Sequence, residues 1–225
     1  MPEKVQKELQ STTVYIEENK KIKADIKASN IATYTCGGLL PALVDCIIMD
    51  VRQNRADEAM VDLQKEIQSF NFRENVTDRL TKELQSTGWL NVKQVHFVND
   101  TSESLREAWV ENSKSDGTLI SRFIWQLNPD FSVLTGTLYV EVFPTSPQLK
   151  KLVNCEDPLE TPIFKFNISA THSLAGSKES LEENAALWAQ EKGCYVRKAL
   201  AGVIEKVFCN LKKILQNPNH LPEAF

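Results

Sequence analysis

Residues 127–144, LNPDFSVLTGTLYVEVFP, decide the centre of the fold. The Asn-Pro-Asp segment at 128–130 is a turn signal, because proline fixes φ and the flanking side chains bond their own backbone. Apolar and polar residues alternate on both sides of it, which is typical of strands with one buried face. The stretch therefore predicts two antiparallel strands, over 118–126 and 131–143, joined by a short connection.

Periodicity predicts the remaining elements on either side of this pair. Further strands are expected at 12–18, 21–28, 92–98 and 162–171. The first two are expected to pair as a hairpin, although 21–28 also has a helix-forming composition. Helices are expected at 39–70, 71–86 and 103–112, and one long helix is expected at about 178–215. A break of the first of these into two helices at the polar run 52–55 is left open.

This order of elements favours an α+β fold. We expect a mostly antiparallel or mixed sheet of about five to six strands, with helices packed on one face and a long C-terminal helix. The 225 residues suffice for one large domain. We place that domain at 12–217, after a flexible N-terminal segment 1–11 and before a C-terminal tail 218–225.

Composition and charge narrow the class of protein. The chain is 42% hydrophobic and 25% charged, as in ordinary soluble globular proteins. Its net charge of −4 argues against broad nucleic-acid binding, which needs excess Lys and Arg.

No apolar run reaches the roughly 18 residues of a membrane span. The longest, 39–49, is interrupted by Asp45 and predicts a buried core helix. The basic run Lys20, Lys21, Lys23 and Lys27 is interpreted as a solvated face.

The five cysteines are Cys36, Cys46, Cys155, Cys194 and Cys209, and they predict reduced thiols. An odd count leaves at least one unpaired within a monomer. Cys194 and Cys209 lie on one predicted helix about 22 Å apart, which excludes a disulfide between them.

No motif predicts a catalytic, cofactor-binding or metal-ligating residue. The sharpest catalytic hypothesis is Cys36, which precedes Gly37 and the expected helix start, where the helix dipole favours a thiolate. His172 or His96 would serve as its base. The interpretation we prefer for Cys36 is a small residue in a tight turn.

Four further features of the sequence are candidates for a functional role: the acidic loop, Asp45, the glycosylation sequons and the tryptophans. The acidic loop 155–160 is a candidate for binding a cation or a partner, but it lacks the glycine turn and alternating oxygens of a calcium loop. Asp45 either lies at the exposed edge of its helix or marks a buried functional groove. Glycosylation sequons at Asn75, Asn99 and Asn167 are interpreted as chance, and Trp89, Trp109, Trp125 and Trp188 as core or interface residues.

Five segments together resemble a known group of proteins. They are GGLLPALVD at 37–45, FNFR at 70–73, GWL at 88–90, LNPDF at 127–131 and the strand end at 140–144. In this order they resemble uncharacterised envelope proteins of Gram-negative bacteria, which are often lipoproteins, over residues 12–215. The resemblance implies an α/β sandwich-like domain facing the periplasm and implies no reaction.

The resemblance leaves the location open. Members of the group carry an N-terminal export signal with a lipidated cysteine, whereas residues 2–35 are polar and contain no such apolar segment. We expect a periplasmic or envelope location if a leader was removed, and a cytoplasmic one otherwise.

The resulting hypothesis is a non-enzymatic envelope or periplasmic protein that acts through contacts with protein partners. One alternative is a small-ligand binding module that holds a lipid or peptide in a groove between sheet and helices. Another is an exported bacterial effector or a cytosolic enzyme with an unrecognised site. The long C-terminal apolar stripe leaves the oligomeric state open, because a core-packed helix and a self-associating one share it.

Overall fold

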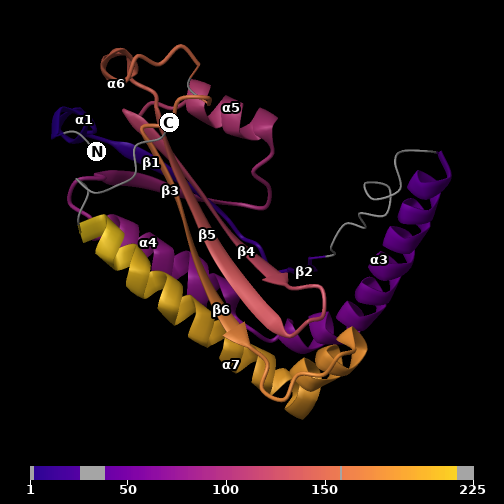
Figure 1. The fold of residues 1–225 in the computed structure, drawn as a ribbon. Coiled ribbons are helices and arrows are strands. Elements are labelled where there is room, and N and C mark those ends of the chain that lie inside the picture. Colours follow the sequence, from indigo (N-terminus) through magenta and orange to yellow (C-terminus); the bar gives the residue numbers. More distant parts are fainter. Residues whose placement is uncertain (1–2, 26–38, 158, 217–225) are drawn as a thin grey trace.

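The computed structural model describes residues 3–25, 39–157 and 159–216, and in them helices flank a mixed sheet (Figure 1). The α+β fold predicted from the sequence is confirmed. The strands are β1 (Thr12–Glu17), β2 (Ile22–Ala24), β3 (Val92–Val98), β4 (Gly117–Leu127), β5 (Val133–Pro144) and β6 (Phe164–Ser173). The helices are α1 (Glu3–Glu8), α3 (Leu39–Ile67), η1 (Arg73–Asp78), α4 (Arg79–Gln85), α5 (Glu103–Glu111), α6 (Pro147–Leu152) and α7 (Leu181–Gln216).

The sheet has the order β3-β1-β4-β5-β6, with β2 paired to β4. β4, β5 and β6 form an antiparallel meander, whereas β1 and β2 run parallel to β4. β1 and β2 lie one after the other on the same side of β4, so the predicted hairpin between them is wrong. Between the two strands, the Asn19 side chain accepts a hydrogen bond from the Lys21 N–H at 3.0 Å. The chain then continues in the same direction.

The turn predicted at 128–130 joins β4 to β5 as expected. The Asn128 side chain accepts the Val133 N–H at 2.8 Å, and Phe131 takes a left-handed φ of 59°. Hydrogen bonds from the Ser132 backbone and hydroxyl hold the pKa of Asp130 below its ordinary value. The two strands then pair without a break from Leu127 opposite Leu134 to Gly117 opposite Pro144.

The main core lies between one face of the sheet and the helices α3 and α7. Phe123, Trp125 and Leu138 point into it from the central strands, and Val203 meets them from α7. A Cβ on Gly136 would lie 2.6 Å from Val203 Cγ1 and 2.8 Å from Phe123, so glycine lets the helix approach β5 closely.

Helix α5 covers part of the opposite face of the sheet. Val110 of α5 packs there on Ile120 and Phe143 in a small separate cluster. Beside it, Arg106 pairs with Glu141 at 2.5 Å, and Lys165 pairs with the other oxygen of the same carboxylate at 3.1 Å.

The expected long C-terminal helix is confirmed as α7, but it has a kink that was not predicted, because two helices join at 190–193. Glu191, Lys192 and Gly193 all have left-handed φ values, of 53°, 55° and 70°. At the junction a Cβ on Gly193 would lie 2.6 Å from Glu66 Cβ, near the end of α3. Arg197 also donates to the Glu66 carbonyl at 2.8 Å. The close approach to α3 therefore favours glycine at this position.

Two short helices were not expected. Residues 3–8, within the segment 1–11 that was expected to be flexible, form α1. Val5 of this helix and Leu9, just after it, are buried. The expected loop 144–161 contains α6, whose start is capped by Ser146. Such short helices depend on tertiary packing rather than on propensity, so periodicity does not reveal them. The domain limits 12–217 stay a prediction, and the tail 218–225 lies outside the described residues.

Candidate binding groove

One edge of the sheet is open at β2. The Asp25 N–H donates to Leu127 O of β4 at 2.7 Å. Because successive residues of a strand direct their backbone groups to opposite sides, Lys23 also faces β4, and Ile22 and Ala24 face away from it. Among the described residues no strand lies on that outer side, since β3 pairs along β1 only.

The side chain of Gln64 from α3 occupies part of this edge. Its Nε2 donates to the Ile22 carbonyl at 2.8 Å. The bond confirms that this carbonyl points away from β4. A side-chain amide thus takes the place that the N–H of a neighbouring strand would hold.

Helix α3 lies beside this edge (Figure 1), and among the described residues none covers the face of α3 that lines the hollow over β2. The exposed or half-buried residues of this face follow helical spacing and are Gln53, Asp57, Val61 and Gln64, with Gln68 just after the end of the helix. Met60 also lines the hollow but is only 7% exposed. The adjacent face, with Ala56, Leu63 and Ile67, is buried in the core. Val61 is 51% exposed, so the packing of α3 ends at the boundary between these two faces.

Two cavities line up along β2 and α3. One, of about 560 Å³, lies between β2 and residues 53–65 of α3, together with Gln68 just after the helix. The other, also about 560 Å³, extends to Lys20, Phe70 and Phe72. They share Ile22, Lys23, Gln64 and Gln68. We call the continuous hollow the β2–α3 groove.

The groove carries a local positive charge in an acidic chain. The charged residues among its described lining are Lys20, Lys21, Lys23, Lys65 and Asp57. Asp57 accepts a hydrogen bond from Gln53 at 2.8 Å. Three of the four lysines interpreted from the sequence as a solvated face therefore border a cavity, while Lys27 lies outside the described residues.

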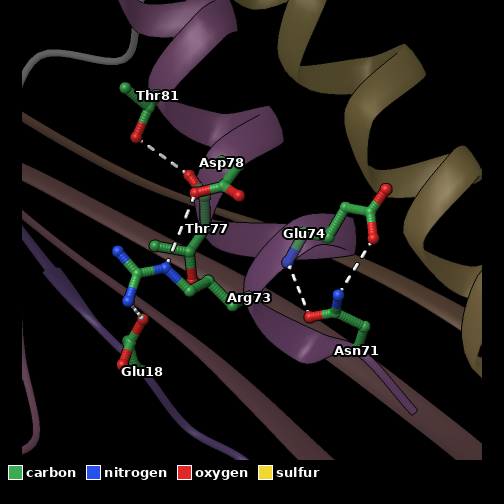
Figure 2. Close-up of polar contacts among 7 residues, drawn as sticks. All are labelled: Glu18, Asn71, Arg73, Glu74, Thr77, Asp78 and Thr81. Atoms are coloured by element: carbon green, nitrogen blue, oxygen red, sulfur yellow. Dashed lines mark hydrogen bonds and ion pairs between the residues drawn. The ribbon is translucent and has the colours of Figure 1, made fainter.

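A second hollow, more polar, borders the π-helical turn η1. It has a volume of about 610 Å³ and is lined by Asn71, Arg73, Glu74, Asn75, Asp78, Arg79 and Lys82. Figure 2 shows Asn71 bonded to Glu74 through both its side-chain oxygen and its side-chain nitrogen, so this residue holds the start of the turn. The sequence predicted an ordinary helix over 71–86, and π-helical turns are rare and often functional.

The cations of this hollow are largely engaged by carboxylates. Arg73 lies between Glu18, at 3.7 Å, and Asp78, at 3.9 Å (Figure 2). Arg79 makes two hydrogen bonds to Glu205, at 2.5 and 3.1 Å, which lower the pKa of Glu205. The hollow therefore offers less uncompensated charge than the β2–α3 groove.

The proposed pairing of a thiol with a histidine base stays untested, because only the two histidines lie among the described residues. His172 is on β6, beside Trp188 and Tyr195, and burial with the nearby Lys206 lowers its pKa. His96 is on β3, at the opposite edge of the sheet, where it stacks on Tyr15. Cys36 lies outside the described residues, so its role as a nucleophile stays a prediction.

The remaining cysteines and the acidic loop show no metal site. Cys155, Cys194 and Cys209 are free thiols, and burial raises the pKa of Cys155. In the described part of the chain no group of three or more His, Cys, Asp or Glu side chains is placed to hold a metal ion. The side chain of Asp45 lies outside that part.

The tryptophans are placed largely as predicted. Trp125 and Trp188 are fully buried, which confirms them as core residues. Trp89 is half-buried and donates to Leu215 O at 3.0 Å, and Trp109 stacks on Tyr15 at 4.4 Å. The sequons lie on η1 (Asn75), after β3 (Asn99) and on β6 (Asn167).

Comparison with known proteins adds little. No protein-family model and no curated protein matches the chain. Among solved structures, the hypothetical protein CT253 from Chlamydia trachomatis matches with 6% identity and a TM-score of 0.33, over 91% of this chain and 98% of that one. A likeness at that level supports no conclusion about this chain.

No helix among the described residues combines the length and the apolar character needed to cross a membrane.

Proposed function

We propose that this protein is a non-enzymatic protein of the bacterial cell envelope that acts through protein–protein contacts, with the β2–α3 groove as its contact site. The observation that carries the proposal is the open edge of β2, where Gln64 bonds the outward Ile22 carbonyl beneath an uncovered face of α3. Exposed strand edges are templates for pairing with another chain unless they are covered.

The composition of the groove supports binding rather than catalysis. Its described lining contains Lys, Gln, Asp and apolar residues, and no Ser, Thr, Cys or His. Nucleophilic catalysis needs a nucleophile and a base within hydrogen-bond reach of each other. Convergent apolar and polar side chains along an open groove are what a recognition surface requires.

Site-specific photo-crosslinking in the native host tests the contact site. A photoreactive phenylalanine analogue replaces Val61, which lines the groove, or Val51, which does not. The two residues are matched, because both lie on α3 and are 51% and 53% exposed. We expect a discrete crosslinked species from position 61 that is absent from position 51. Equal crosslinking from both positions, or none from 61, would contradict the groove as the contact site.

The envelope location rests on the sequence resemblance and needs its own test. Fractionation of the host into cytoplasm, periplasm and membranes, with detection by antibody, measures it directly. We expect the protein in the periplasmic or membrane fraction. Recovery in the soluble cytoplasm alone would remove the envelope part of the proposal and leave the contact site to be judged by crosslinking.

A further inference from the structure

We infer that the occupant of the β2–α3 groove is an extended, acidic peptide segment of a partner protein, which joins the sheet as a strand beside β2. This inference rests on the proposed function and deepens it. Addition of a strand to a sheet edge is an established mode of peptide recognition, in which backbone bonds give affinity and side-chain pockets give specificity.

The backbone of β2 has the groups for such pairing. The carbonyl of Ile22 and the N–H and carbonyl of Ala24 point to the outer side, as the bond from Asp25 to β4 requires. A neighbouring strand would lie about 4.8 Å away and would use these groups. Gln64 now satisfies the Ile22 carbonyl at 2.8 Å, so an incoming N–H would replace the Gln64 amide.

The two faces of β2 dictate the side chains of the added strand. Ile22 is 4% exposed and points into the core, whereas Lys23 is exposed on the opposite face. Inward residues of an added strand would pack beneath the uncovered face of α3, on Met60 and Val61. Outward residues would lie beside Lys23, where an acidic side chain pairs favourably across the strands. The expected ligand therefore alternates apolar and acidic residues.

The length of the groove sets the length of the segment. The lining extends from Gln53 of α3 to Gln68, one residue past the end of the helix, which is about 22 Å at 1.5 Å per residue. An extended strand covers that distance with about seven residues.

The charge of the lining argues against the chain's own connecting segment as the occupant. Residues 26–38, which follow β2 in sequence, contain one lysine and no acidic residue. Lys65 pairs with Asp62 at 3.0 Å, which leaves Lys20, Lys21 and Lys23 against Asp57 in the described lining, and this excess of lysine attracts a segment of the opposite sign.

Fluorescence anisotropy with the purified full chain tests strand addition. The probe is a fluorescein-labelled seven-residue peptide of alternating Glu and Val, compared with two isomers that are N-methylated at every Val or at every Glu. Only one set of N–H groups can face β2, so one isomer should lose at least tenfold in affinity and the other should bind within about threefold of the parent. Equal behaviour of the two isomers, or no binding of the parent, would overturn the inference. A positive crosslink at position 61 would still support the contact site, so the two failures are distinguishable.

Two variants, each with a control, test the roles of Lys23 and Gln64. Lys23→Glu should weaken binding of the parent peptide at least tenfold, whereas Lys198→Glu, on the exposed surface of α7, should leave it within twofold. Gln64→Ala removes the competing amide and should strengthen binding about threefold to tenfold. Gln85→Ala, on the exposed surface of α4 and outside the groove, should leave it within twofold. Weaker binding by Gln64→Ala, or equal effects of the two lysine variants, would overturn strand addition at β2.

Discussion

The two long helices of this protein use their surfaces differently. After its break, α7 buries a nearly continuous stripe against the sheet, including Val196, Leu200, Val203, Val207 and Leu211. In the part of α3 whose side chains are described, 50–67, every residue from 50 to 55 is exposed and the first buried one is Ala56. A helix that packs along its length stabilises the fold, whereas one that overhangs a sheet edge leaves a surface free for binding.

The largest expected effect is a loss of folding stability from a substitution in the buried stripe of α7. Leu200→Ala removes a fully buried side chain and should lower the free energy of unfolding by about 2–5 kcal/mol, through lost burial and the cavity that remains. Val61→Ala, on the open face of α3, should change it by less than about 0.5 kcal/mol. Urea unfolding monitored by circular dichroism measures both. Similar losses for the two variants would show that α3 is as tightly integrated as α7.

A smaller effect is expected where the two helices meet. Gly193→Ala puts a Cβ 2.6 Å from Glu66 Cβ at a φ of 70°, and it should cost about 2–4 kcal/mol from left-handed strain together with overpacking. Gly176→Ala is the matched control, because its φ is 69° and nothing lies within 4 Å of the new Cβ. It should cost about 1–2 kcal/mol from the backbone alone. If the two losses are equal, the close contact between α3 and α7 does not require glycine.

The smallest effect concerns the ion pair that joins the helices, Arg55 to Glu182 at 2.5 Å. The pKa of Glu182 is lowered to about 2, first by a hydrogen bond from Ser180 and then by backbone and Arg55 bonds. The folded state favours the carboxylate, so this stabilisation is present above the ordinary pKa of 4.5 and is lost as the pH falls toward 2. Both side chains are exposed, so it should amount to less than about 0.5 kcal/mol.

NMR titration of the Glu182 side-chain carboxyl measures this pKa. Ser180→Ala should raise it more than Arg55→Gln does, since the serine bond is the largest cause. The reverse order would show that the interaction with Arg55, rather than the hydrogen bond from Ser180, controls the pKa of this carboxyl group.

Elements specified by local chemistry were predictable from the sequence. The turn at 128–130 works through proline and the Asn128 side chain, and both act on neighbouring backbone. β3 was predicted with its observed limits, Val92–Val98. Where a signal and its structural effect lie within a few residues of each other, pattern analysis succeeds.

Features that depend on distant partners were not predictable. The pairing of β2 with Trp125–Leu127 involves residues about a hundred positions apart, and nothing within 21–28 specifies that partner. The break in α7 had one local sign, Gly193, but the apolar stripe on both sides outweighed it. The groove was not predicted, because in the sequence Lys20, Lys21 and Lys23 resemble an ordinary solvated run. Only the packing of α3 beside β2 shows that these lysines border a groove.

The arrangement of strands around β4 also orders the folding of the chain. β4, β5 and β6 are consecutive antiparallel strands, so their contacts are close in sequence and form early. β1 and β2 pair with a strand that begins only at Gly117, so their contacts close a long loop. During synthesis on the ribosome, β2 therefore waits until residues 125–127 have emerged, with both of its edges unpaired. The N-terminal half of the nascent chain depends on its later-made centre for protection from aggregation.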